Sequence, residues 1–185
     1  FTGEQAKAAC YSERMKGAED ILDILEEGGF ESGTLQQKLA EKVPHVGNYF
    51  ATEPQQLAMQ AANDWSSAYL RQVSGATITA ADVADNNAVF FPQSGDGPSV
   101  KAAKKLAREA AYNAVATMSG GKHKITMKDH ERMKSDARKL IAKAIVEDRK
   151  NGQTVSDKTM NFIDSNSQNV NVFEGVPGAD QIKWD

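Results

Sequence analysis

The sequence predicts an all-α protein of several amphipathic helices joined by short loops, elongated or bundle-like, with an extended C-terminal tail. Three observations support this fold class. Apolar residues recur at alternating spacings of three and four, which is the period of one face of an α-helix. Hydrophobic residues make up 40% of the chain and aromatic residues only 7%, and much of the hydrophobic share is alanine. Glycines and helix-capping residues separate the periodic segments. We therefore expect a thin core made by close contacts between helices.

The first predicted helix carries a heptad-like apolar seam and ends at Gly28-Gly29. The seam consists of Tyr11, Met15, Ala18, Leu22 and Leu25. Acidic residues are expected to make the rest of its surface negative: Glu13, Glu19, Asp20, Asp23, Glu26 and Glu27. Cys10 is the single cysteine, so no disulfide can form within the chain, and we expect it to be a small buried residue rather than a reactive thiol.

Further helices follow after a short one expected from Leu35 to Lys42. Thr52 and Pro54 mark the start of the next, which ends at Ser74-Gly75. Its apolar stripe is Ala58, Ala61, Trp65, Ala68 and Gln72, flanked by Leu57 and Tyr69. Thr79 and Asp82 predict an N-cap for a short helix through about Asn87.

An aromatic anchor and a tight loop, Val89 to Pro98, come before a long helix that starts at Pro98. This helix is lined by Val100, Ala103, Ala107, Ala110, Ala114 and Met118. Gly120-Gly121 ends it. A second basic helix then carries the stripe Met133, Ala137, Leu140, Ile141, Ala144 and Ile145. We accordingly divide the chain into a helical region 1–120, a basic helical region 121–164 and an extended tail 165–185.

Charge is distributed unevenly, although the whole chain carries only −3. Residues 1–100 contain 6 Lys/Arg and 14 Asp/Glu, whereas residues 101–150 contain 14 Lys/Arg and 6 Asp/Glu. Such a basic block can neutralise phosphates of double-stranded DNA without sequence specificity. It can equally be a solvated helix face, or meet an acidic partner, including the acidic N-terminal helix of the same chain or of another copy. The candidate contact residues are Lys101, Lys104, Lys105, Arg108, Lys128, Arg132, Lys134, Arg138, Lys139 and Lys143.

Candidate chemistry is sparse, so we expect neither an enzyme nor a bound metal or cofactor. His123 and His130 lack further ligands for a metal site. The Gly95-Asp96-Gly97 segment lacks the alternating acidic ligands of an EF-hand and favours a turn. Glu31-Ser32 resembles the region of the catalytic acid in lytic transglycosylases, but the Gly-Leu-Met-Gln type segment expected downstream is absent. No apolar run is long enough to span a bilayer, and no signal peptide is visible.

One segment indicates a protein family more specifically than the overall composition does. It begins with Leu70 to Thr79 (LRQVSGATIT), continues with Phe90 to Pro98 (FFPQSGDGP), and is followed by Lys104 and Arg108 on the next helix. This pattern resembles a segment of the internal virion proteins of tailed bacteriophages, also called DNA-ejection or DNA-transfer proteins. The resemblance covers about residues 3–118 and is strongest from 65 to 108.

The chain departs from the family pattern at two positions. Val73 stands where the family usually has Glu, and Ser94 where it has Pro. The basic region after Lys122 has no counterpart in the pattern. If the family glutamate makes a buried hydrogen bond or ion pair, this chain lacks that interaction.

The resemblance implies a virion structural protein that leaves with the genome and assists its passage into the host cell. Its location would be the capsid interior, the portal or the tail lumen, and then the host envelope. The implied partners are other copies of the chain, portal or tail proteins, double-stranded DNA and, transiently, the host envelope. As the assembly surface we expect Tyr11, Met15, Leu22, Leu25, Phe90 and Phe91. Two alternatives remain open: the C-terminal part of a tail tape-measure protein, and a peptidoglycan-cleaving virion enzyme that uses Glu31.

Overall fold

The structure, a computed structural model, describes residues 2–28, 30, 53–93 and 95–121, together with 131–132, 134–139, 141, 157 and 161. Four helices account for most of the described chain: α1 (Gly3–Glu27), α3 (Glu53–Ser74), α4 (Ala80–Phe90) and α5 (Pro98–Met118). The predicted all-α fold class is confirmed. The short helix expected at Leu35–Lys42 and the extended tail at 165–185 lie outside the described residues.

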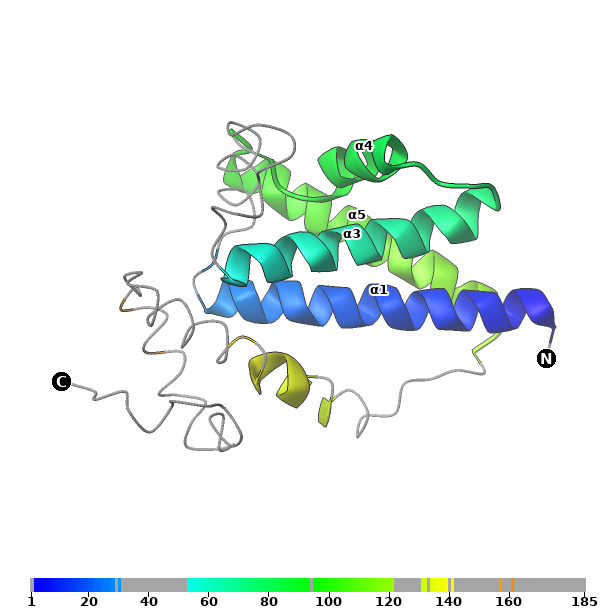
Figure 1. Ribbon diagram of the computed structural model, residues 1–185, viewed down its shortest axis with the longest axis horizontal. Helices are drawn as coiled ribbons and strands as arrows, with labels where there is room; N and C mark the ends of the chain where they lie inside the picture. Colours follow the sequence, from blue (N-terminus) through cyan, green and yellow to red (C-terminus); the bar gives the residue numbers. More distant parts are fainter. Residues whose placement is uncertain are drawn as a thin grey trace.

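The long helices α1 and α3 lie side by side, and α5 passes behind them (Figure 1). The short helix α4 packs on α3 and α5 at the edge of this bundle. A helical turn at residues 134–139 lies against α1 and contributes Ala137, and the neighbouring Ile141 is fully buried. Part of the predicted basic region 121–164 therefore shares one core with region 1–120.

Local capping interactions define both ends of helix α1. The side chain of Thr2 accepts a hydrogen bond from the backbone N–H of Gln5, and the Gln5 side chain accepts one from the backbone of Thr2. Gly28 is the C-cap, as the sequence predicts. The predicted seam faces inward, with Met15, Ala18, Leu22 and Leu25 all buried and Tyr11 half-buried.

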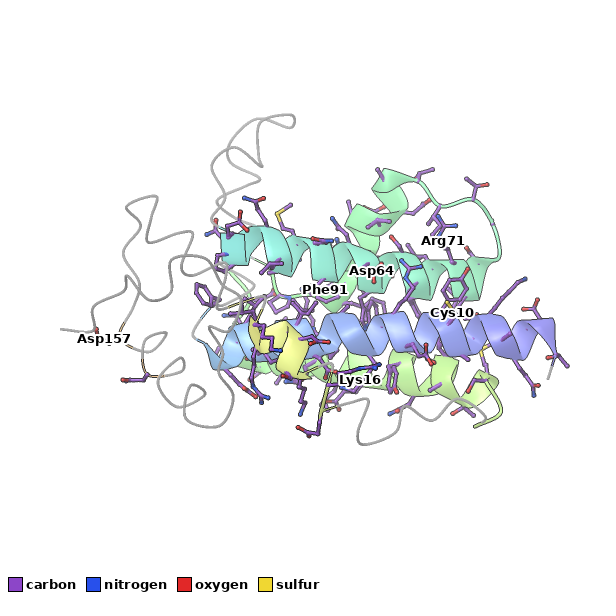
Figure 2. The ribbon with its side chains drawn as sticks, turned by 60° about the horizontal axis from the view of Figure 1, so that its bottom comes forward. Cys10, Lys16, Asp64, Arg71, Phe91 and Asp157 are labelled. Carbon is purple, nitrogen blue, oxygen red and sulfur yellow. The ribbon has the colours of Figure 1, made fainter. Side chains whose placement is uncertain are left out.

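Two expectations about α1 are wrong. Asp20 is not part of an acidic surface, because it is 2% exposed and forms an ion pair with Lys16 one turn earlier. Cys10 is not buried, because it lies on the exposed side of the helix (Figure 2). Neighbouring Ala8 and Ala9 take the buried positions instead.

The core is thin, as alanine richness predicts. Helix α3 contributes Ala58, Ala61 and Ala68 together with Trp65, which is 1% exposed. Small side chains allow α1 and α3 to approach closely, and Trp65 is the largest fully buried side chain of the described residues. Helix α3 ends at Ser74, and Gly75 follows with a φ of 62°.

Helix α4 starts at the predicted capping box, in which Thr79 and Asp82 exchange hydrogen bonds. It continues to Phe90 rather than stopping near Asn87. The extension is favoured because the added residues are held from α3 and α5: the Phe90 ring packs on Trp65, and its carbonyl oxygen accepts a hydrogen bond from Arg108. A polar network also ties the helix to α3, in which Ser66 donates to Asn87 at 2.6 Å and accepts from Asn86 at 2.8 Å. This network fixes the direction in which the chain leaves α4.

Candidate functional site

Four aromatic rings meet where the end of α4 lies on α3. The Trp65 ring centroid lies 5.4 Å from that of Tyr69, 5.0 Å from that of Phe90 and 5.4 Å from that of Phe91. Such stacked, tilted and edge-on contacts add to the stabilisation that burial alone provides. Phe91 is 1% exposed and points into the interior of the bundle (Figure 2). The predicted aromatic anchor is therefore a buried fold element.

Arg108 of α5 joins three parts of the fold at this point. Its Nε and Nη2 atoms donate to the two carboxylate oxygens of Glu19, each at 2.9 Å, and its Nη1 atom donates to the carbonyl oxygen of Phe90 at 2.8 Å. The guanidinium carbon lies 4.9 Å from the centroid of the Phe91 ring. The side chains of Arg108 and Glu19 are only 7% and 14% exposed. This forked geometry is one that arginine provides and lysine cannot.

Lys104, one turn before Arg108, holds the loop that follows α4. Its ammonium group donates to the carbonyl oxygens of Ala88 and Phe91 at 3.0 and 3.1 Å, and to the Asp96 carboxylate at 2.7 Å. All three of its donors are thus used, and two of them satisfy carbonyls at the C-terminal end of α4. Gly95 adopts a φ of 85° in this loop, a conformation that glycine adopts without strain.

Asp96 is held in its ionised form by the same loop. The backbone N–H of Gln93 donates to its carboxylate at 2.7 Å, and with the Lys104 ammonium it lowers the pKa of Asp96 below its ordinary value of 3.8. The Gly95-Asp96-Gly97 segment is accordingly a turn, as its sequence favours. The Asp96 carboxylate braces the loop through these contacts.

Lys105 completes the inward-facing cations of α5. It lies 2.8 Å from Asp23 and 4.0 Å from Glu26, and the hydrogen bond with Asp23 raises the pKa of Lys105 above its ordinary value. We name Glu19, Asp23, Lys104, Lys105 and Arg108 the α1–α5 charge cluster. The acidic partners of Lys105 and Arg108 thus lie on the N-terminal helix of the same chain, one of the alternatives that the charge distribution left open, whereas the partner of Lys104 is Asp96.

The remaining predicted contact residues are placed unevenly. Lys101 is half-buried on α5, and on the helical turn Lys134 and Arg138 are half-buried while Arg132 and Lys139 are exposed. Lys128 and Lys143 lie outside the described residues. Among the described candidates, Lys101, Arg132, Lys134, Arg138 and Lys139 lie outside the α1–α5 charge cluster. Fewer described residues are therefore available to contact DNA than the sequence predicted.

The predicted assembly surface is corrected by the structure. Met15, Leu22, Leu25 and Phe91 are each less than 9% exposed and form the core of the chain, and Tyr11 and Phe90 pack against it half-buried. The heptad-like seam of α1 is satisfied within the chain, because α3 and α5 cover it. The four buried side chains are therefore not available to a neighbouring molecule in this fold.

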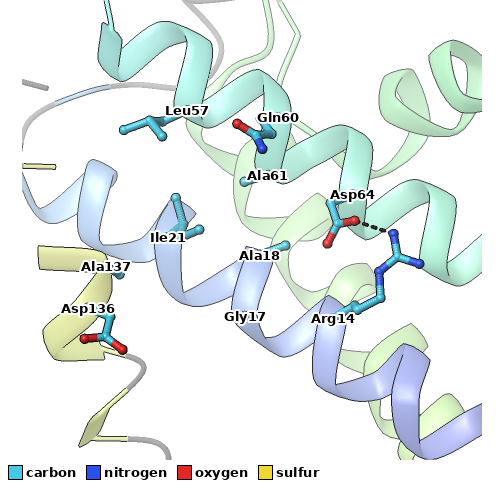
Figure 3. A pocket seen from close by; sticks show the side chains of 10 residues that line it. All are labelled: Arg14, Gly17, Ala18, Ile21, Leu57, Gln60, Ala61, Asp64, Asp136 and Ala137. Carbon is cyan, nitrogen blue, oxygen red and sulfur yellow. Dashed lines mark hydrogen bonds and ion pairs between the residues drawn. The ribbon is translucent and has the colours of Figure 1, made fainter. Parts of the chain in front are cut away.

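A pocket of about 440 Å³ opens between α1, α3 and the helical turn at 134–139 (Figure 3). An ion pair between Arg14 of α1 and Asp64 of α3 closes one end, and the hydrogen bond from this pair raises the pKa of Arg14. Gly17, Ala18, Ile21, Leu57, Gln60, Ala61, Asp136 and Ala137 line the rest. Aliphatic groups dominate this lining, so the pocket suits an apolar group.

The sequence pattern did not predict which face of α5 is exposed to solvent. The stripe that the sequence identified on this helix faces solvent, with Val100 45% and Met118 54% exposed. Leu106, which was not part of that stripe, is 65% exposed. Ala103, Ala107, Ala110 and Ala114 of the same stripe are exposed as well. Glu109 is the one charged side chain among the exposed residues of α5. Helix α5 thus turns its cations toward the core and its apolar stripe outward.

Comparison with protein-family models, with curated proteins and with solved structures finds no match. Within the described part of the chain, no helix is both long and apolar enough to cross a membrane. The same residues contain no group of three or more His, Cys, Asp or Glu side chains that could hold a metal ion. Glu31 and the three histidines lie outside the described residues.

Proposed function

We propose that this chain is a virion structural protein of a tailed bacteriophage, of the DNA-ejection class, which leaves the capsid with the genome and assists its passage into the host cell. The observation that supports the proposal is that the residues that carry the resemblance contact one another in the fold. The segment Leu70–Thr79 links α3 to α4, and Phe90–Pro98 links α4 to α5. Lys104 and Arg108 bind the second link directly. The pattern therefore describes one contiguous structural unit.

The departures from the family pattern are compatible with this unit. Val73, where the family usually has Glu, is 55% exposed near the end of α3. A residue at that position makes no buried ion pair, so the exchange of Glu for Val leaves the α1–α5 charge cluster unchanged. Ser94, the second departure, lies outside the described residues.

The energetics of the fold also suit a protein that travels through a narrow channel. Each buried alanine removes little apolar surface from water, and the hydrophobic stabilisation per helix contact is correspondingly small. Domains of this kind open at modest cost, and association with other copies or with portal and tail proteins restores the lost stability. In this proposal the protein acts through assembly and contact.

In this proposal, basic residues outside the α1–α5 charge cluster make the contact with DNA. Lys104, Lys105 and Arg108 are already neutralised by carboxylates of the same chain. Releasing them to phosphates would leave Glu19 and Asp23 without partners, which opposes binding. We therefore assign phosphate contact to Lys134, Lys139 and the basic residues around them.

Mass spectrometry of purified virions, before and after triggered release of DNA, tests the proposal. We expect the chain in full particles and its depletion from emptied ones. Retention in the emptied particle would overturn the ejection function. Separation of heads from tails distinguishes the alternative, because a tape-measure protein would be found with the tails alone.

The enzyme alternative has its own test. We expect no peptidoglycan-cleaving activity in the wild-type chain, and none in Glu31→Gln. Cleavage by the wild type that disappears in Glu31→Gln would replace the proposed function with that of a virion muralytic enzyme.

A further inference from the structure

Two basic side chains of the helical turn at residues 134–139 lie partly buried without a carboxylate beside them. Lys134 and Arg138 are four residues apart, so they lie on the same face of the turn, and both are half-buried. Neither forms an ion pair within the part of the chain that the structure describes. The Nε atom of Arg138 is buried and donates to no acceptor. This face therefore carries two uncompensated positive charges.

Partly buried cations elsewhere in the described residues are neutralised within the chain. Each of the following pairs joins such a cation to a carboxylate: Arg14–Asp64, Lys16–Asp20, Lys104–Asp96, Lys105–Asp23 and Arg108–Glu19. By contrast, two like charges one turn apart destabilise a helix, and a buried N–H without an acceptor is costly. An anion bound at Lys134 and Arg138 would remove both costs.

We propose that Lys134 and Arg138 form a binding site for a phosphate group of the DNA backbone, in which Arg138 makes a forked contact. A phosphate placed side-on accepts from Nε and one Nη atom of an arginine together, so we expect the guanidinium to turn outward on binding and Nε to gain its acceptor. Lys134 adds a second positive charge to the same phosphate or to its neighbour. The inference rests on the proposed function and names the residues and geometry of its DNA contact.

A duplex fits this site better than a free phosphate ion does. Each strand carries about one phosphate per 3.4 Å of helix axis, and residues one turn apart on the protein helix are separated by about 5.4 Å along it, so neighbouring phosphates lie within reach of the pair. Lys139, the next residue after Arg138, is exposed about 100° around the turn from it. A free phosphate ion cannot use this additional charge at the same time.

Fluorescence anisotropy of a labelled DNA duplex, titrated with the purified full chain at several salt concentrations, tests the proposal. We expect Arg138→Gln to lower the affinity at about 0.1 M salt by about eightfold, the effect of one lost phosphate contact. Arg71→Gln is the matched control, because Arg71 is an exposed cation near the end of α3, away from the turn (Figure 2), and it should bind like wild type. Equal affinities of the two variants would overturn the inference.

Two further arms test the fork and the source of the phosphate. Arg138→Lys keeps the charge but not the fork, so its salt dependence should match wild type while its affinity falls; an affinity equal to that of wild type would exclude the forked contact. Isothermal titration with inorganic phosphate and with poly-L-glutamate tests the other anions. Binding of either that depends on Arg138, when binding of DNA does not, would assign the site to a small phosphorylated ligand or an acidic protein and overturn the DNA assignment.

Stability of the free chain provides a measurement that does not involve a ligand. Because no partner of Arg138 is lost, Arg138→Gln should unfold in urea at the same midpoint as wild type. A midpoint lowered as far as that of Arg108→Ala would show that Arg138 holds the fold together, which contradicts the inference. All of these measurements use the purified chain, so their failure is distinct from failure of the virion experiment.

Discussion

Removal of the Arg108 side chain is the sharpest test of how this fold is held together. Arg108→Ala deletes two hydrogen bonds to Glu19 and one to the Phe90 carbonyl, together with the contact over the Phe91 ring. It leaves the Glu19 carboxylate, 14% exposed, without its forked partner. Breaking a buried ion pair by removing one member costs about 3–5 kcal/mol. Total stability of a domain is about 5–15 kcal/mol, so the loss is a large fraction of it.

Urea unfolding followed by circular dichroism at 222 nm measures this loss as a fall in the free energy of unfolding. Lys7→Ala is the matched control, because the Lys7–Glu4 pair is exposed at 62% and 78% and removing it should leave the unfolding midpoint unchanged. The double variant Glu19→Met with Arg108→Met should be more stable than Arg108→Ala, since neither charge then remains buried alone. A loss below about 1 kcal/mol for Arg108→Ala, as for a surface pair, would refute this account of the cluster.

Two further predictions concern acid stability and DNA. Because the pKa of Asp96 is lowered, its contribution to stability is complete above 3.8 and is lost as the pH falls through the lowered folded value. Asp96→Asn should therefore lose stability less steeply in acid than wild type in urea unfolding at a series of pH values, and equal slopes would contradict this. Replacing Lys134 and Lys139 by Gln should reduce the salt dependence of double-stranded DNA binding by about two in the log–log slope, whereas Lys105→Gln should leave it unchanged. A wild-type response that does not change with salt would exclude direct phosphate binding by these residues.

Much of the secondary structure could be predicted because its causes are local. The capping box of Thr79 and Asp82, the glycine at position 28 and the proline at position 98 act within one helical turn. They can therefore be identified without knowing what each helix packs against. The end of α4 was placed too early, because its last residues are held by other helices: Phe90 packs on Trp65 of α3, and its carbonyl oxygen accepts from Arg108 of α5.

The candidate site was predicted only in part. The sequence placed Lys104, Lys105 and Arg108 among ten candidate contact residues and left open that the acidic N-terminal helix neutralises the basic block. It did not identify Glu19 and Asp23 as the partners, because those residues lie more than 80 positions earlier in the chain. The apolar pattern of a sequence cannot identify such a pair, because each partner has the sequence surroundings of an ordinary surface charge.

Sequence by itself determined that this protein is all-α, where its main helices begin and end, and that its core is built largely of alanine around Trp65. Tertiary structure alone decided which face of α5 is buried. In α1 the apolar seam is covered within the chain, whereas in α5 the ion pairs of Arg108 and Lys105 turn the apolar stripe outward. The physical reason is that a forked, desolvated ion pair can outweigh the burial of a few alanines, and its partner comes from a distant part of the chain.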